Sequence, residues 1–378
     1  MISRSWRLGR FAQLVGNDAA RKAMQGALVG NSLPGGFLVT GAHGTGRAAI
    51  ASALALASTC LQPDLSPFDS CDVCDSCTRA LKGTQPEIVH IYPAGETIQI
   101  WQFWDRDNRP RGVLSHGLQF APMVGRRRVF IIHNCEKLTE SAANSLLKVL
   151  EEPPSYVLFI LIAVHAARVL PTIASRCRQV RVLALPGSIL TSYLTSNCGV
   201  STEKAHMLVA YCEGRAGQAI TLARNPQAIE EVESVLKFAL ELPSAKRVQA
   251  LRMAEQMRRL ASGMHIIIGE DAPEPSAVDE SADTPKERAA RRQQAAVLEL
   301  LSMFYRDLLA VSVGGARARV VNRDSVVAIT SLAANGTPAR WSACIDSIMK
   351  ATRRLEANAS VGLLTDVLAM NLVDESLV

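Results

Sequence analysis

The sequence predicts a three-layer α/β domain built on a parallel sheet, followed by a region made only of helices. In the first half of the chain, short apolar runs alternate with helix-forming segments. This is the pattern of parallel strands that crossover helices cover on both faces. From about residue 186 the strand pattern stops, and helical spacing of apolar residues continues towards the C-terminus.

The expected strands are short apolar segments, each bounded by turn residues or a helix. The first stops at the glycine-rich stretch Gly41–Gly46, and residues 47–57 after it are strong helix formers. The second precedes a helix over 141–152, which Pro153 ends because proline cannot continue the hydrogen-bond ladder. The four strands are expected at residues 35–40, 128–132, 157–164 and 179–183.

The helical half divides by its glycines and by one change in composition. Residues 187–225 break into short helices, as in a small helical domain, and longer amphipathic helices follow. Residues 270–286 are acidic, contain prolines and lack large apolar side chains, so we expect a mobile segment without a known role. The predicted division is an α/β domain at 1–184, a small helical domain at 185–225 and a helical domain at 226–378, with a mobile linker at 269–287.

Composition limits the function classes only broadly. With 378 residues, 48% of them hydrophobic and 20% charged, the chain has the composition of a globular protein of two or three domains. A net charge of +6 is a weak indication of acidic partners, and 5% aromatic content argues against stacking platforms for single strands. The N-terminal residues resemble no signal peptide, and the longest apolar run, 157–164, is too short to cross a bilayer. We therefore expect a cytoplasmic protein with reduced thiols.

The stretch Gly41–Gly46 has the position of a phosphate-binding loop but lacks part of its chemistry. Such a loop needs Gly-x4-Gly-Lys-Ser/Thr, in which lysine reaches the outer phosphates and the hydroxyl binds magnesium. Here the glycines are Gly41, Gly44 and Gly46, while Arg47 replaces the lysine and Ala48 the hydroxyl residue. We expect a strand-to-helix turn without functional ATP or Mg²⁺ binding, although the sequence leaves weak nucleotide occupancy open.

Four of the nine cysteines form a cluster with metal-ligand spacing. They are Cys60, Cys71, Cys74 and Cys77, within an insertion at about 60–78. Four thiolates fill a tetrahedral zinc site and leave no position for water, so the site is expected to be structural. The alternatives are a redox Cys-x-x-Cys pair or unligated thiols. We expect the other five cysteines to be small buried residues.

Two further motifs indicate a family. Asn144–Pro154 reads Asn-Ser-Leu-Leu-Lys-Val-Leu-Glu-Glu-Pro-Pro, and Pro171–Cys177 reads Pro-Thr-Ile-Ala-Ser-Arg-Cys. With the cysteine insertion, they resemble the AAA+ clamp-loader subunits of bacterial DNA polymerase III, from about Phe11 to Ala223. The resemblance implies an AAA+ module, a helical lid at 185–225 and a C-terminal collar. It also implies gamma/tau and delta subunits as partners, and a sliding clamp and primer-template DNA in the assembly.

Departures from the family's motor pattern favour its non-hydrolysing, delta-prime type of subunit. A motor needs an Asp-Glu pair after the strand at 128–132, where this chain has His133-Asn134. The two sensor positions that the resemblance implies fall at Ala163–Val164 and Gly217, which lack the family's sensor residues. We expect Arg215 to lie at the surface, with the role of a displaced second sensor as the alternative. We therefore expect a stator without intrinsic ATPase activity within the polymerase holoenzyme. The alternatives are a divergent gamma/tau-like motor with weak ATP binding or hydrolysis, and a zinc-containing DNA-binding module.

One catalytic arginine of the family is retained. In the resemblance, Arg176 of Ser-Arg-Cys is an arginine finger offered in trans to ATP on the neighbouring subunit, a role that neutralises charge on the transferred phosphoryl group. The alternative is an ordinary surface arginine.

Lesser features have structural interpretations. We expect Arg126–Arg128 to lie on a charged edge loop, with phosphate contact as the alternative, and Trp101, Phe103 and Trp104 to pack under the sheet. His43 and His133 have no partner at metal spacing, and we expect them to be incidental.

Overall fold

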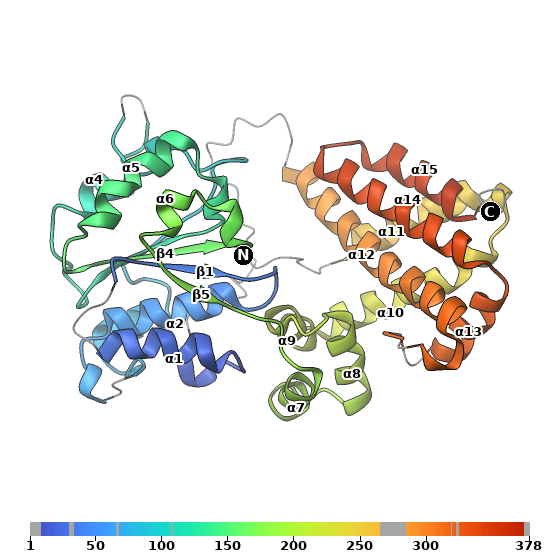
Figure 1. The fold of residues 1–378 in the computed structure, drawn as a ribbon, viewed down its shortest axis with the longest axis horizontal. Coiled ribbons are helices and arrows are strands. Elements are labelled where there is room, and N and C mark those ends of the chain that lie inside the picture. The colour runs from blue at the N-terminus through green and yellow to red at the C-terminus, as the bar shows by residue number, and fades with distance from the viewer. Residues whose placement is uncertain are drawn as a thin grey trace. The chain divides into compact units, whose positions relative to one another are not determined.

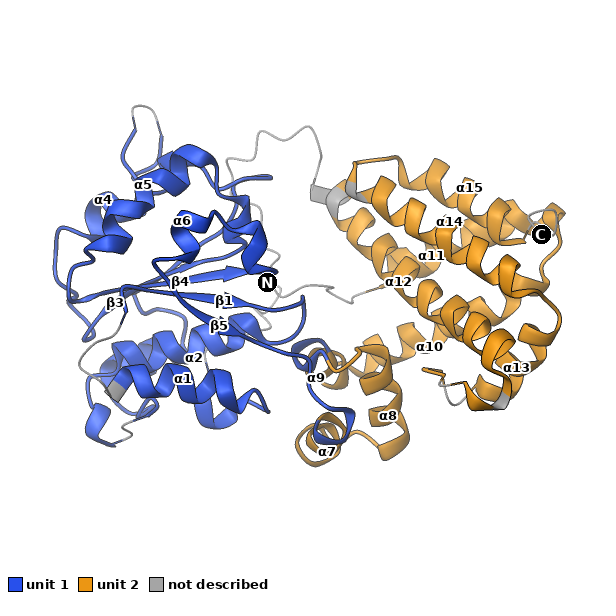
Figure 2. Cartoon of the chain, in the orientation of Figure 1, with its two compact units in different colours: residues 1–189, 215–218, 269–281 blue, residues 190–214, 219–268, 282–378 orange. Residues whose placement is uncertain are grey.

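A computed structural model describes residues 9–29, 34–65, 68–106, 109–264, 285–318, 320–322 and 325–373. The described chain forms two compact units (Figure 2). The first contains the described residues up to Ile189 and the short segment Arg215–Gln218; the second contains Leu190–Gly214 and the described residues from Ala219 onward.

The first unit is built on a five-stranded parallel sheet of order β2-β3-β4-β1-β5. Central strand β4 pairs with β1 on one side, Gly36 opposite Phe159, and with β3 on the other, Arg128 opposite Val157. The strands are β1 (Gly36–Thr40), β2 (Ile88–Ile91), β3 (Arg128–Ile132), β4 (Val157–Ala163) and β5 (Arg178–Arg181). Four of them confirm the predicted strands, with β5 beginning one residue earlier and ending two residues earlier.

Alternate residues of the strands enter two separate cores, one on each face of the sheet. Phe37 and Val39 pack with helices α1 (Asp18–Val29) and α2 (Arg47–Thr59). Leu38 between them faces the opposite core, with residues of α4 (Val113–Gly117), α5 (Glu140–Glu151) and α6 (Pro171–Ala174). Figure 1 shows the helices on both sides of the sheet. The three-layer α/β prediction is confirmed, because the central strands β1, β3 and β4 have apolar residues on both faces.

Strand β2 was not predicted. Ile88 and Ile91 are buried, whereas Val89 and His90 between them are half-buried. The strand lies at the edge of the sheet and pairs with β3 alone. A four-residue edge strand with a histidine inside it carries neither a continuous apolar run nor a clear alternation.

Helix α5 forms as its sequence predicts. The Thr139 hydroxyl accepts a hydrogen bond from the Ala142 amide, which caps the N-terminus. Leu146 and Leu150 are buried against the sheet, one turn apart. The helix ends at Glu151, two residues before Pro153.

The second unit contains only helices in its described residues. The 30-residue helix α12 (Pro285–Gly314) packs against α10 (Pro226–Glu241), α11 (Ala250–Gly263), α13 (Val326–Ala334) and α14 (Pro338–Glu356). Helix α15 (Val361–Val373) packs against α11 and α14. Trp341 and Tyr305 fill the bundle core, where the Asp307 carboxylate accepts hydrogen bonds from the backbone amides of Val321 and Asn322. The remaining helices of the chain are α3 (Asp75–Leu81), α7 (Gly187–Cys198), α8 (Thr202–Tyr211) and α9 (Ala216–Ala223).

The all-helical C-terminal region is confirmed, while the three-domain division stays a prediction. Most of the predicted linker at 269–287 lies outside the described residues, and α12 begins at Pro285. Among the described helices, none is long and apolar enough to cross a membrane.

Candidate functional site

The glycine loop joins β1 to α2 and requires glycine at two of its positions. Gly44 and Gly46 have φ angles of +76° and +98°, a region that side chains with a Cβ atom rarely adopt. A Cβ atom at Gly44 would also lie 3.0 Å from Cβ of Gln218. The loop therefore keeps the tight turn of a phosphate-binding loop.

The cation of this loop contacts the loop itself. Arg47 is the first residue of α2 and is only 1% exposed, and its Nη2 atom lies 3.1 Å from Nδ1 of His43. Ala48, at the hydroxyl position, is buried in the core beneath the sheet. His43 is thus a polar partner of Arg47.

The segment Arg215–Gln218, from the predicted lid, belongs to the first compact unit and contacts the glycine loop. The backbone amide of Gln218 donates a hydrogen bond of 3.1 Å to the carbonyl oxygen of Gly44. Arg215 is half-buried, and its Cβ atom lies 3.5 Å from the position that a Cβ at Gly44 would take. The stem of Arg215 thus lies beside the glycine loop while the residue stays partly exposed, and its role stays a prediction.

The position of the motor's acidic pair is filled by a buried histidine and an asparagine. His133 follows β3; its Nε2 atom lies 3.1 Å from Nδ1 of His90, and its ring stacks on Tyr92 at 4.2 Å between centroids. These contacts place His133 in a cluster of rings with His90 and Tyr92.

Glu136, three residues further on, was missed by the sequence reasoning. Its Oε1 atom accepts a hydrogen bond of 3.3 Å from the amide of Val164, at the first sensor position. The carboxylate therefore ties the segment after β3 to the end of β4. Glu136 lies outside the two positions where the acidic pair was expected, so no motif in the sequence pointed to it.

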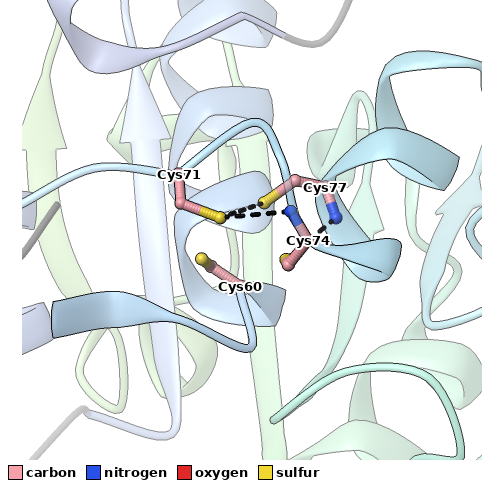
Figure 3. A group of neighbouring side chains, drawn as sticks. All are labelled: Cys60, Cys71, Cys74 and Cys77. Atoms are coloured by element: carbon pink, nitrogen blue, oxygen red, sulfur yellow. Dashed lines mark hydrogen bonds between the residues drawn. The ribbon is translucent and has the colours of Figure 1, made fainter. Parts of the chain in front are cut away.

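The four clustered cysteines meet at the C-terminal end of α2 (Figure 3). Cys60 follows α2 directly, Cys71 and Cys74 lie in the following loop, and Cys77 lies in α3. Their sulfur atoms all lie within 4.8 Å of one another, and the sulfurs of Cys71 and Cys77 are 4.0 Å apart. Three of the cysteines are buried, and Cys71 is partly exposed.

This arrangement fits a tetrahedral ion. Thiolates at about 2.3 Å from zinc lie roughly 3.8 Å from one another. The amides of Cys74 and Cys77 point at the sulfurs of Cys71 and Cys74, at 3.4 and 3.5 Å, as donors that favour thiolates. Burial opposes ionisation of Cys74, but the Cys77 amide and neighbouring donors outweigh it and lower the pKa of Cys74 to about 7. The four cysteines can thus hold a metal ion.

The cysteine insertion is fixed to the rest of the unit by buried polar groups. The Ser76 hydroxyl donates to the Thr59 carbonyl at the end of α2, 2.8 Å away. The Asp69 carboxylate accepts from the amides of Phe11 and Ala12, at 3.0 and 2.9 Å. An ion at the cysteines would therefore stabilise the end of α2 and the N-terminal segment together.

Among the other cysteines, burial is confirmed for Cys135, Cys177, Cys212 and Cys344. Cys198 is only partly buried, because it lies in the last turn of α7.

Arg176 lies between α6 and β5 and is held by two acceptors. Its Nε and Nη2 atoms both donate to Oε1 of Glu151, at the end of α5, the former at 2.7 Å. Its Nη1 atom donates to the Thr172 carbonyl oxygen at 2.8 Å. The Arg176 side chain is 32% exposed.

The basic residues 126–128 and the aromatic residues near 101–104, which the sequence singled out, lie beside the sheet or pack against other side chains. Arg128 begins β3 and forms a 2.6 Å ion pair with the buried carboxylate of Glu87, so it is not part of a loop that could hold phosphate. Burial, and next the charge of Arg126, lower the pKa of Arg127. Phe103 is buried below the sheet with Trp104 packed beside it, as expected, whereas Trp101 lies against Arg109 instead.

Comparison with known proteins shows which proteins the chain resembles. A model of the family described as DNA polymerase III, delta subunit, matches residues 16–186. The delta' subunit of DNA polymerase III from Bacillus subtilis is 25% identical over 351 residues, which cover 92% of this chain and 94% of that protein. The chain is therefore similar to clamp-loader subunits of bacterial DNA polymerase III. The resemblance found in its helix and Ser-Arg-Cys motifs is thereby confirmed.

Two other DNA polymerase III-related proteins are similar to part or most of the chain. The tau/gamma subunit of Haemophilus influenzae is 30% identical over 194 residues, 51% of this chain. That match spans only 27% of the relative's own length. Among solved structures, a gamma subunit-related protein from Thermotoga maritima is 18% identical, with a TM-score of 0.41, and covers 94% of this chain and all of its own.

Proposed function

We propose that this chain is the non-hydrolysing stator of a clamp loader, of the delta-prime type. It would assemble with gamma/tau motor subunits and a delta subunit in the cytoplasm, and the assembly would place the sliding clamp on primer-template DNA. The chain would bind neither ATP nor Mg²⁺ productively in its own loop. The B. subtilis delta' relative, matched over nearly its whole length, supports this type.

The observation that carries the proposal is the state of Arg47. A phosphate loop works because its cation points outward at the outer phosphates. Here the cation is buried and lies against His43, while Ala48 offers no ligand for magnesium. The absence of a carboxylate at His133-Asn134 removes the group that would position the attacking water.

Two further roles belong to the proposal. Arg176, partly exposed beyond α6, would reach ATP bound by the adjacent motor subunit as an arginine finger. The four cysteines would hold a structural Zn²⁺, because four sulfur ligands close the coordination sphere. The helices from α7 to α9 would act as the lid, and those from α10 onward as the oligomerising collar.

The test is ATP binding and hydrolysis by the purified chain, first alone and then with gamma/tau and delta. The stator proposal expects no turnover by the chain alone and stimulation when it completes the complex. Turnover by the isolated chain that Arg47→Ala abolishes would instead identify a divergent motor.

A further inference from the structure

The ion pair between Arg176 and Glu151 has a geometry that bears on how the arginine is presented. The guanidinium has five N–H groups. Three of its nitrogens, Nε, Nη1 and Nη2, each donate inside the chain, to the Glu151 carboxylate or the Thr172 carbonyl. One N–H therefore remains on each of the two terminal nitrogens.

Glu151 and Arg176 each have a closely packed residue next to them in the chain. Their neighbours Leu150 and Cys177 are buried against Gly36 of β1. A Cβ atom at Gly36 would lie 2.9 Å from the Cys177 sulfur and 3.2 Å from Cδ2 of Leu150, so glycine lets both side chains pack closely against β1. Leu150 near the end of α5 and Cys177 after α6 thereby pack against the same residue of β1, next to the pair of Glu151 and Arg176.

We infer that Glu151 is a positioning residue for Arg176: it binds one edge of the guanidinium and leaves the terminal N–H groups directed at a phosphoryl group of a neighbouring subunit. This rests on the proposed arginine-finger role. A free arginine side chain samples many rotamers, and a carboxylate that binds Nε and Nη2 together selects one orientation of the planar group. The Glu151 carboxylate also stays bound to the Arg176 guanidinium while the two outward N–H groups donate to the phosphoryl group.

The first test measures the pairing itself in the full chain, without any partner. Phenylglyoxal modifies exposed arginines, and peptide mass spectrometry follows Arg176 alone. Because an exposed ion pair is of modest strength, Glu151→Gln should speed modification of Arg176 by about two- to fivefold. Glu152→Gln is the matched control, since Glu152 is exposed and adjacent, and it should leave the rate unchanged. An unchanged rate in Glu151→Gln would overturn the inference.

The second test uses the assembled loader with DNA and clamp. Glu151→Gln should lower kcat for ATP by part of the deficit that Arg176→Ala causes, with KM unchanged. The double variant should match Arg176→Ala alone, because Glu151 acts through that arginine; a merely structural role would add a further loss.

The two proposals fail in different ways. If Arg176→Ala lowers the rate but Glu151→Gln does not, the positioning role is wrong and the finger stands. If Arg176→Ala itself has no effect, both are wrong, whatever the modification rates show.

Discussion

The Nη2 atom of Arg47 lies 3.1 Å from Nδ1 of His43, so the cation at the start of α2 is bound by the loop that precedes it. In a working phosphate loop, the cation at this position binds the outer phosphates of the nucleotide. The loop's glycine turn is intact, but its cation is engaged within the chain. The loss of function that we propose would therefore concern the loop's side chains and not its backbone.

Restoring the loop's side chains should not restore an ATPase. We expect Arg47→Lys with Ala48→Thr to show no hydrolysis above the unmodified chain, because His133-Asn134 supplies no carboxylate. Ala48 is buried in an apolar core, so the added hydroxyl should also cost about 1–3 kcal/mol of stability. Phosphate release and urea unfolding measure the two effects. Sustained turnover by the double variant would contradict the account of the lost acidic pair.

Removal of one cysteine ligand should release the metal. We expect freshly purified, unchelated protein to contain about one zinc per chain by metal analysis. Cys77→Ser, at a fully buried ligand, should lose most of that zinc and lower the Tm by about 5 °C or more. Cys198→Ser, outside the cluster, is the control and should retain the metal. Native protein without zinc would rule out the proposed site.

Much of the sheet and of the cysteine cluster could be predicted because their signals are local. Strand β4 is a continuous apolar run buried at every position, and the cysteine ligands stand close together in sequence. The edge strand β2 could not be predicted in the same way, since its sequence Ile-Val-His-Ile is short and half-exposed.

The contacts around the glycine loop were beyond sequence reasoning for a different reason. The hydrogen bond from Gln218 to Gly44 joins backbone atoms of residues far apart in the chain, and any residue type can supply those atoms. The pairing of His90 with His133 depends on β2 and β3 being neighbours, which required β2 to be known. Tertiary placement, not residue identity, defines these parts of the site.

The ion pair between Glu87 and Arg128 should give acid-dependent stability. Although burial alone would raise the pKa of Glu87, the hydrogen bond and charge of Arg128 and the amide of Met123 lower it below the usual 4.5. The pair therefore contributes stability that is fully present above about pH 4.5 and is lost as the pH falls through the lower pKa of the folded state.

We expect Glu87→Gln to lower the free energy of unfolding at pH 7 by about 3 kcal/mol, since it leaves the Arg128 cation without its carboxylate. Urea unfolding at pH 7 and at successively lower pH measures the difference from the unmodified chain. That difference should shrink as the pH falls below about 4.5. A difference that is constant with pH would show that Glu87 acts by packing and not by charge.

Replacement of Arg176 tests the catalytic contribution to a neighbour. Arg176→Ala should change the stability of the isolated chain by less than about 1 kcal/mol, because the pair with Glu151 is partly exposed. In the assembled loader, the same variant should remove turnover at the one ATP site that the arginine serves, where such a residue contributes on the order of 10³-fold or more. Total ATPase activity should therefore fall by that site's share, and clamp loading should fall with it. Arg178→Ala, on the exposed start of β5, is the control for loss of charge nearby. Normal hydrolysis and clamp loading by a complex that contains Arg176→Ala would exclude the finger, because no other residue of the Ser-Arg-Cys motif carries a positive charge.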